Sequence, residues 1–492
     1  MLRKIRIALA GLVLAGITLL FLDLSGTLHT WLGWMAKIQF VPAVLAVNLA
    51  VVIALVLLTL VLGRVYCSVI CPLGIFQDIV SWIRGRSKKN RFTYKKELKW
   101  LRYGIWVLFI AALVAGVQVF VALLEPYSAF GRMTQNLLGP LYGWGNNLLA
   151  WISERAGGYA FYPKEVWIRS LPTFLVAVVT LVVVVVMAWT GGRTYCNSIC
   201  PVGTTLSFLS RFAMFRPVID REKCRSCKAC EKKCKASCID ISEHRIDYSR
   251  CVDCFDCIES CKFGALHYRF AWKRNAGSTA PANDPGRRQF MATGALLGTS
   301  ALAAHAQKKR DGGLAEILPK TTPTRTVPLT PPGSGGADRF YDICTACQLC
   351  VAACPNNVLR PSASIERLMQ PEMDYGKGYC RPECTECSKV CPCGAILPLT
   401  PEEKTTRKIG TASVDRSLCI VERDGVHCGN CARHCPAGAI MMVHMDPDDE
   451  ESLRIPVVDE SRCIGCGACE NLCPSRPLSA ITVNGCHTHI SN

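Results

Sequence analysis

The sequence contains one motif twice, as Gly63-Arg-Val-Tyr-Cys-Ser-Val-Ile-Cys-Pro-Leu-Gly74 and as Gly192-Arg-Thr-Tyr-Cys-Asn-Ser-Ile-Cys-Pro-Val-Gly203, with eight of twelve positions identical. Each copy directly follows a long apolar stretch. Two helical hairpins that end in the same cysteine pair indicate an internal duplication. This duplication is expected to bring four cysteines together, namely Cys67, Cys71, Cys196 and Cys200. Four thiolates suffice for a shared metal site, but a redox dithiol or packing around a Cys-Pro helix start would use the same residues.

Four apolar stretches are long enough to cross a bilayer core, which needs about 20 residues. They cover residues 5–24, 40–62, 103–124 and 171–189. Lys and Arg gather before the first stretch and between the second and third, whereas the loops at 23–39 and 125–170 are nearly neutral and rich in Trp. By the positive-inside rule, the N-terminus and the end of the fourth stretch face the cytoplasm. We therefore expect four transmembrane helices, arranged as two repeated hairpins.

The sequence holds 31 cysteines, of which 24 fall in six short runs. Tight repeated clusters are typical of metal ligation, whereas disulfide frameworks pair widely spaced residues. Two runs have the spacing C-x2-C-x2-C-x3-C, namely Cys224, Cys227, Cys230, Cys234 and Cys251, Cys254, Cys257, Cys261. In this pattern three thiolates bind one cubane and the fourth reaches the neighbouring cluster. Cys261 should complete the first [4Fe-4S] cluster and Cys234 the second, and the interleaved pattern disfavours zinc.

Four further runs lie in residues 338–492, and each ends in Cys-Pro. They are Cys344, Cys347, Cys350, Cys354; Cys380, Cys384, Cys387, Cys391; Cys419, Cys428, Cys431, Cys435; and Cys463, Cys466, Cys469, Cys473. The proline fixes the backbone after the fourth ligand. Each half of this region is expected to form a ferredoxin-like pair of clusters. Three cysteines outside all groups, Cys238, Cys393 and Cys486, are interpreted as incidental.

The charge is unevenly distributed, with a net −5 in residues 338–492 and +23 in residues 1–337. The basic residues lie beside apolar stretches, so membrane orientation explains them without nucleic acid. A twin-arginine-like segment with Arg287 and Arg288 precedes a moderately apolar stretch at 292–304. Because twin-arginine transport exports folded domains, we expect a periplasmic C-terminal domain and an uncleaved fifth span. A chance Arg-Arg pair, with everything after residue 190 cytoplasmic, is the alternative.

The expected fold is multidomain. Residues 1–212 form the membrane module, and residues 213–272 form an α+β bacterial ferredoxin-like domain with two [4Fe-4S] clusters. Residues 273–337 hold the twin-arginine-like segment, the fifth span and a Pro/Gly linker. Residues 338–492 form a double ferredoxin-like domain with four clusters.

The double Cys-x3-Cys-Pro module, the two-cluster region, the twin-arginine-like segment and the four further runs together resemble NapH joined to NapG. The NapH-like part covers residues 1 to about 270, and the NapG-like part about 286 to 492. These are accessory quinol-oxidising proteins of periplasmic nitrate reduction. Related modules occur in NosR and in copper-oxidase assembly factors, so the resemblance does not fix the terminal acceptor. The four C-terminal runs also resemble four-cluster respiratory subunits, which implies nesting of the first run with the fourth and the second with the third.

The resemblance implies a quinol dehydrogenase of the bacterial inner membrane, with six [4Fe-4S] clusters, or seven if the repeated pairs bind one. Quinol would pass electrons to a periplasmic reductase or cytochrome, and partners would include lipid, the quinone pool and other membrane subunits. No C-x-x-C-H haem motif or Gly-rich nucleotide loop is present. His29, Glu125 and Tyr127 are candidates for taking protons from quinol, or else interfacial anchors. The second hypothesis is a maturation factor that delivers cytoplasmic electrons to a periplasmic metalloenzyme.

Overall fold

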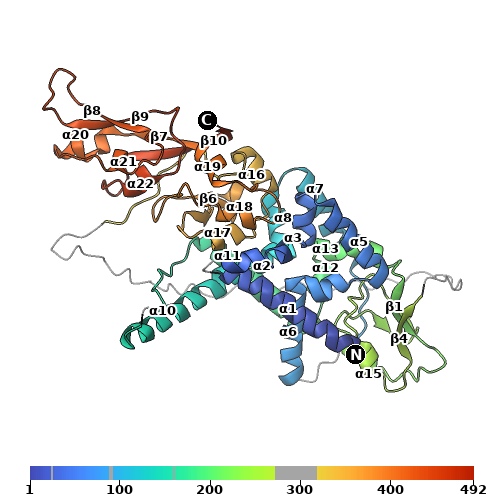
Figure 1. The fold of residues 1–492 in the computed structure, drawn as a ribbon. Helices are drawn as coiled ribbons and strands as arrows, with labels where there is room; N and C mark the ends of the chain where they lie inside the picture. Colours follow the sequence, from blue (N-terminus) through green and yellow to red (C-terminus); the bar gives the residue numbers. More distant parts are fainter. Residues whose placement is uncertain (24–25, 88–91, 159–160, 272–317, 492) are drawn as a thin grey trace, which may run out of the picture.

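The computed structural model describes residues 1–23, 26–87, 92–158, 161–271 and 318–491. Within these residues, a helical module lies between two units built around short antiparallel strand pairs (Figure 1). The twin-arginine-like segment with Arg287 and Arg288 and the expected fifth span at 292–304 lie outside the described residues.

The helical module accounts for residues 2–210. Its helices are α1 (Leu2–Leu22), α2 (Thr27–Leu32), α3 (Trp34–Lys37), α4 (Phe40–Leu45), α5 (Leu49–Leu62), η1 (Tyr66–Ile70), α6 (Pro72–Ser87), α7 (Lys99–Val114), α8 (Gln118–Leu124), α9 (Pro126–Met133), η2 (Thr134–Leu138), α10 (Gly139–Arg155), α11 (Leu171–Gly191), α12 (Thr194–Ser198) and α13 (Pro201–Ser210).

Two of these helices, α1 and α11, are long and apolar enough to cross a membrane, with 21 residues each. At about 1.5 Å per residue each measures about 31 Å, close to the thickness of a hydrocarbon core. The prediction of single helices over 40–62 and 103–124 is wrong, because each stretch is interrupted. Val47 and Gly116, with φ of 52° and 74°, separate α4 from α5 and α7 from α8.

Both interruptions lie against the C-terminal unit. A Cβ placed on Gly394 would be 3.7 Å from the Cα of Ala46, and one placed on Gly116 would be 3.7 Å from an Asp342 carboxylate oxygen. The Gln118 side chain also donates a hydrogen bond to the carbonyl of Asp342. The broken helices therefore shape the end of the module that receives this unit.

The first ferredoxin unit has the α+β arrangement expected from its sequence. It consists of β1 (Phe215–Ile219), α14 (Ala229–Lys233), β2 (Ile239–Asp240), β3 (Arg245–Ile246), α15 (Asp256–Ser260) and β4 (Leu266–Phe270). Strand β1 pairs with β4 and β2 with β3, both antiparallel. The unit is fixed to the start of α1, where Arg3 Nε lies 2.7 Å from Asp256 Oδ1.

The C-terminal unit consists of two halves. The first holds α16 (Ala337–Ile343), α17 (Leu349–Ala353), β5 (Leu359–Pro361), η3 (Ile365–Arg367), β6 (Pro371–Met373), α18 (Glu386–Val390) and α19 (Pro401–Thr406). The second holds β7 (Arg407–Val414), η4 (Arg416–Leu418), α20 (Ile420–Asp424), α21 (Asn430–Arg433), β8 (Ile440–His444), β9 (Arg454–Val458), α22 (Ala468–Leu472) and β10 (Ile481–Ser491).

In the second half, the first strand, β7, pairs with the last, β10, and the two strands between them, β8 and β9, pair with each other. The first ferredoxin unit has the same arrangement, in which β1 pairs with β4 and β2 with β3. Part of the expected linker packs into this C-terminal unit: Leu329 is fully buried, and Arg325 Nη2 lies 2.6 Å from Glu470 Oε1.

The two ferredoxin units lie at opposite ends of α1 (Figure 1). Arg3 at its start contacts the first unit. Near its end, the Phe21 ring packs beside Gly131, where an added Cβ would be 2.6 Å from both Phe21 and the carbonyl oxygen of Cys347. Any path between the two units therefore runs along the helical module.

Candidate iron–sulfur centres

Four of the cysteine loops share an unusual backbone. In each, the residue before and the residue after the second cysteine have positive φ: Ser226 and Lys228, Asp253 and Phe255, Ala346 and Gln348, Gly465 and Gly467. Alternating right- and left-handed residues turn successive backbone N–H groups inward, which forms an anion-binding concavity typical of iron–sulfur sites. Only the last loop uses glycine. The other three hold non-glycine residues in a costly conformation, as functional sites do.

The first ferredoxin unit contains two cavities with four predicted ligands at each. Cys224, Cys227, Cys230 and Cys261 line one cavity. Cys234, Cys251, Cys254 and Cys257 line the other. The fourth cysteine of each run thus lies with the first three of the other run, which agrees with the interleaved pattern.

In the C-terminal unit the cysteines group within each half. Cys380, Cys384 and Cys387 share a cavity with Cys354 of the first run. Cys463, Cys466 and Cys469 share one with Cys435 of the third run. Burial and the neighbouring Cys428, Cys473 and Cys419 raise the pKa of Cys431 to about 11, which places these four thiols together as well.

The predicted nesting of first run with fourth and second with third is therefore wrong. The physical reason is that the paired strands β7 and β10 enclose the third and fourth runs as one compact ferredoxin fold. The structure instead agrees with the expectation that each half of the C-terminal unit holds its own pair of clusters.

Two cysteines that sequence reasoning set aside lie inside the predicted sites. Cys238 lines the cavity of Cys234, and the two sulfurs are 3.5 Å apart. Cys393 is 2% exposed, and its sulfur lies 3.8 Å from that of Cys391. Burial and then the nearby Cys393 raise the pKa of Cys347 to about 12. The signal that could have found them is their position four and two residues after a predicted ligand.

The cysteine groups fit clusters better than single ions. Among the described residues, no three His, Cys, Asp or Glu side chains are placed to hold one metal ion. In a [4Fe-4S] cluster each thiolate binds a different iron, so the sulfurs surround a wider space.

Arg132 supplies a second test of this fit. Its guanidinium is buried, and none of its nitrogens has a hydrogen-bond partner among the described residues. Burial lowers the pKa of Arg132 to about 10, opposed by Glu125, Tyr195 and Cys347. A cluster bound through Cys347 would offer sulfur acceptors and negative charge to these donors.

The repeated motif brings its cysteines together in the centre of the helical module. Cys67, Cys71, Cys196 and Cys200 are free thiols, each 4% exposed. Burial and then Cys196, Cys67 and Cys200 raise the pKa of the Cys71 thiol well above its usual value.

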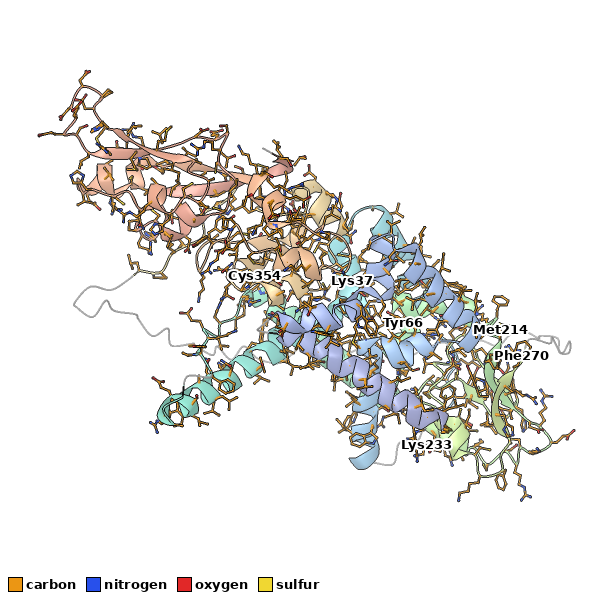
Figure 2. All side chains as sticks on the ribbon, in the orientation of Figure 1. Lys37, Tyr66, Met214, Lys233, Phe270 and Cys354 are labelled. Atoms are coloured by element: carbon orange, nitrogen blue, oxygen red, sulfur yellow. The ribbon has the colours of Figure 1, made fainter. Side chains whose placement is uncertain are left out.

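Contacts between these groups place them in one series. The backbone N–H of Arg64, in the repeated motif, donates to Asp253 Oδ2 in the first ferredoxin unit at 2.8 Å. Within the C-terminal unit, the N–H of Cys380 donates to the carbonyl of Cys466 at 3.0 Å, which joins the two halves. These contacts join the first unit to the repeated motif and the two halves of the C-terminal unit to each other, and Arg132 lies near both Tyr195 of the motif and Cys347 of the C-terminal unit, since both act on its pKa. Figure 2 shows Tyr66, the neighbour of Cys67, between Lys233 of the first unit and Cys354 of the C-terminal unit.

The three candidates for a quinol site are buried, so the interpretation as interfacial anchors is wrong. His29, Glu125 and Tyr127 are 9%, 1% and 0% exposed. The Glu125 carboxylate caps α9 by accepting from the N–H groups of Tyr127, at 3.1 Å, and Ser128. Burial raises the pKa of Glu125. Sequence reasoning placed these residues at a water interface because the covering C-terminal unit is distant in the chain.

His29 has a carboxylate partner. Its Nδ1 lies 3.0 Å from Asp23 Oδ2. Asp23 in turn lines a cavity of about 710 Å³ between the module and the C-terminal unit, whose walls include Phe21, Trp167, Arg169 and Cys354. This cavity is large enough for a small organic ligand and reaches a predicted cluster ligand.

Comparisons with known proteins agree on iron–sulfur chemistry. Residues 44–90 and 173–219, which contain the repeated cysteine pairs, match a family described as 4Fe-4S binding domain. Residues 426–476 match a 4Fe-4S dicluster domain, and residues 338–360 match another 4Fe-4S binding domain. The chain therefore carries ferredoxin-type 4Fe-4S domains, as expected of an electron-transfer protein.

Three relatives cover different shares of the chain. An uncharacterized protein of Methanocaldococcus jannaschii is 26% identical over 50% of this chain and 80% of its own length. The methylamine utilization ferredoxin-type protein MauM of Methylobacillus flagellatus is 31% identical over 33% of this chain and 70% of its own. The ferredoxin-type protein NapF of Escherichia coli is 29% identical over 33% of this chain and 87% of its own. No solved structure matches the chain.

Proposed function

Because the chain belongs to the family of ferredoxin-type 4Fe-4S proteins represented by MauM, we propose that it oxidises quinol at a membrane and passes the electrons through [4Fe-4S] clusters to a periplasmic reductase or cytochrome. The observation that supports this proposal is that the cysteine groups of the two ferredoxin units are joined by contacts through the repeated motif and Arg132. Quinol loses two electrons and two protons to become quinone. Each electron reduces one cluster.

We propose that the module spans the bacterial inner membrane, with the first ferredoxin unit cytoplasmic and the C-terminal unit periplasmic. Besides α1 and α11, the surface supports this: Ile53 and Leu57 on α5 and Val179 on α11 are each more than half exposed, although apolar. A soluble protein rarely exposes so large an apolar surface.

The C-terminal unit packs on the loops that the positive-inside rule places outside. Arg169 Nη1 donates to the carbonyl of Val351 at 2.6 Å, and Lys377 Nζ lies 3.0 Å from Glu165 Oε2. The first unit packs on the opposite, basic end of the module, through Arg3. This arrangement supports export of the C-terminal unit by the segment around Arg287 and Arg288.

The cavity of about 710 Å³ is the proposed quinol site. Trp167 and Phe21 offer apolar and aromatic surface to a quinol ring, and the carboxylate of Asp23 lies within the wall. Asp23 and His29 form a hydrogen-bonded pair that can take a proton from a quinol hydroxyl. Cys354, also in the wall, places a cluster beside the ring.

The test is reduction by quinol of the purified full chain in detergent, followed by electron paramagnetic resonance. Wild type should show reduced-cluster signals after a reduced ubiquinone or menaquinone analogue is added. Asp23→Asn should slow this reaction by roughly 10² to 10⁴-fold while leaving reduction by dithionite unchanged. Asp338→Asn, a change in an exposed carboxylate, is the control and should behave as wild type. If quinol leaves all clusters of the wild type oxidised, quinol oxidation is wrong.

Location is tested separately, by an epitope inserted into the exposed hairpin at residues 446–451. In spheroplasts with intact membranes, the epitope should bind antibody from outside. An epitope that binds only after lysis would place the C-terminal unit in the cytoplasm.

A maturation factor is the second candidate, because the series of cysteine groups reaches the first ferredoxin unit as well as the C-terminal one. In that function, a cytoplasmic reductant would donate to the first unit and a periplasmic metal centre would accept. Strains without the gene separate the two candidates. Loss of quinol-dependent turnover with a correctly assembled partner enzyme favours quinol oxidation, and a partner lacking its active metal centre favours maturation.

A further inference from the structure

Helix α10 projects from the helical module instead of packing into it. Figure 1 shows it leaving the module crosswise to α1, close to the C-terminal end of α1, which it contacts. Of its 17 residues, only Ala150 is buried. If α1 crosses the bilayer, a helix in this direction lies along the membrane surface.

The covered face of α10 is its polar face. The chain segment 161–169 runs back along the helix and is held there by two neighbouring asparagines. Asn146 donates to the carbonyl of Tyr162 and Asn147 donates to the carbonyl of Lys164, both at 2.8 Å. The backbone N–H of Lys164 donates in return to the Asn147 side chain at 2.7 Å. These amide side chains are therefore bound within the protein.

The opposite face of α10 is apolar and open. Residues three, four and seven apart share one face of a helix. The side chains that share this face are 49% to 61% exposed, namely Leu141, Trp144, Leu148, Trp151 and Ile152. A helix on the surface of a water-soluble protein turns its polar side outward. Helix α10 has the reverse arrangement, which is favourable only where the outward face meets an apolar environment.

The residue types on the outward face favour lipid over a second protein. Helices that associate within a membrane approach each other through small residues. Gly143 is instead turned to the covered face, where an added Cβ would be 2.7 Å from Val166. The outward face is dominated by large side chains and holds two tryptophans, and tryptophan gathers where hydrocarbon meets the lipid headgroups. In the last turn, the Arg155 guanidinium lies 3.9 Å from the centre of the Trp151 ring.

The start of α10 also lines the cavity of about 710 Å³. Gly139 and Tyr142 belong to its wall, together with Lys164 and Trp167 of the segment that covers the helix. Tyr142 is at the same time 47% exposed, so it belongs both to the cavity wall and to the surface of the protein. The apolar face of α10 therefore adjoins the cavity.

We propose that α10 lies in the plane of the membrane, with its apolar face in the outer headgroup–hydrocarbon interface, and that quinol enters the cavity from the lipid along this helix. Acyl chains and the interfacial tryptophans provide the contact, so no particular headgroup is required. The inference rests on the proposed function, from which it takes the membrane location and the quinol cavity. It adds a lipid-binding element outside the membrane-crossing helices.

Photo-crosslinking tests the lipid contact. The full chain is placed in vesicles of phosphatidylethanolamine and phosphatidylglycerol, with the photoreactive residue p-benzoylphenylalanine in place of either Leu148 or Asn147. After illumination, mass spectrometry should find position 148 joined to phospholipid and position 147 joined to the segment 161–169. If position 148 is joined to a second copy of the chain, or to nothing, α10 does not lie in lipid.

A third position separates this proposal from the proposed membrane location. Val179 on α11 is exposed and should be joined to lipid wherever the module spans the bilayer. Lipid adducts at position 179 but not at position 148 would refute the role of α10 and leave the membrane location standing. Absence of lipid adducts at both positions would refute the membrane location and the role of α10 together.

Entry of quinol along α10 is tested by the rate of cluster reduction in the same vesicles. The double variant Leu148→Asn with Ile152→Asn removes apolar contact from the outward face, and neither residue lines the cavity. The concentration of long-chain quinol that gives half the maximal rate should rise severalfold, while the maximal rate should not change. A water-soluble short-chain quinol should reduce the variant and wild type alike.

Val426→Asn is the matched control, because Val426 is an exposed apolar residue of the C-terminal unit, and it should behave as wild type. Equal half-maximal concentrations of long-chain quinol in the double variant and wild type would refute entry along α10. If quinol does not reduce wild type at all, entry is refuted with the proposed function, and the crosslinks still decide whether α10 lies in lipid.

Discussion

Asp78 on α6 holds three cations that come from different parts of the chain. Its carboxylate lies 2.8 Å from Arg193 Nη2, 2.7 Å from Arg6 Nη1 and 3.6 Å from Lys235 Nζ. Burial raises the pKa of Asp78, but Arg193, then Lys235 and Arg6, outweigh this and hold the pKa well below its usual range. One carboxylate therefore joins α1, the repeated motif and the first ferredoxin unit.

Asp78→Asn should destabilise the module strongly. The change leaves the buried guanidinium groups of Arg193 and Arg6 without a carboxylate, and breaking a buried pair in this way costs about 3 to 5 kcal/mol. For a unit of 150 to 250 residues, 1 kcal/mol shifts the midpoint of thermal unfolding by roughly 2 to 4 °C. The expected fall in the midpoint is therefore roughly 6 to 20 °C.

The assay is thermal unfolding of the full chain in detergent, followed by circular dichroism of the helices. Asp424→Asn is the matched control, because Asp424 pairs with Arg423 at 2.7 Å on the surface, where both side chains are 43% exposed. Exposed pairs contribute little to stability, so this variant should melt with wild type. If Asp78→Asn also melts with wild type, the carboxylate does not join the three elements and the reasoning fails.

Two further predictions concern the C-terminal unit. Cys393 lies beside Cys391, so either cysteine can serve as the fourth ligand of the cluster bound by Cys347. The single variants Cys391→Ser and Cys393→Ser should each keep this cluster, while the double variant should lose four irons per chain. Loss of the cluster from both single variants would show that neither cysteine can replace the other. Burial lowers the pKa of His489 to about 4, whereas the pKa of a histidine in the unfolded chain is about 6.5. Between these two pH values the unfolded chain binds a proton that the folded chain does not bind. The free energy of unfolding should therefore fall as the pH drops from 6.5 to 4. Denaturant unfolding should show this slope in wild type and in His487→Gln, whose side chain is exposed, but not in His489→Gln. An unchanged slope in His489→Gln would assign the effect to another group.

Local spacing was enough to predict the ferredoxin-type groupings, because the ligand loops fix their own geometry. The short steps between Cys224, Cys227 and Cys230 force three sulfurs toward one cavity, and the turn after Cys230 carries Cys234 to the next. The pairing of whole runs depends on which strands meet. That information lies in the contact of β7 with β10, far apart in the chain, and the resemblance to larger subunits predicted it wrongly.

The helix interruptions could not be read from hydropathy. Val47 is a β-branched residue in a continuous apolar stretch, and nothing in the local sequence predicts its left-handed φ of 52°. Asn48 then caps α5 by accepting from the N–H of Val51 at 3.3 Å. The break lies where Gly394 of the C-terminal unit approaches the backbone at Ala46, a contact that the local sequence does not reveal. Burial of Glu125 and Tyr127 has the same origin, because the C-terminal unit covers them.

The repeated motif contained more information than a comparison of its cysteines suggests. The arginine of each copy contacts the first cysteine and the last glycine of the other copy. The arginine and glycine are therefore the same in both copies because the two copies contact each other. The difference between Asp78 and Ser207, at equivalent positions just beyond the motif, then means that only Arg193 is paired with a carboxylate from the other copy. This asymmetry lies where the first ferredoxin unit meets the motif, since the backbone N–H of Arg64 donates to Asp253 of that unit at 2.8 Å. The two copies therefore differ at the place where one of them receives another unit of the protein.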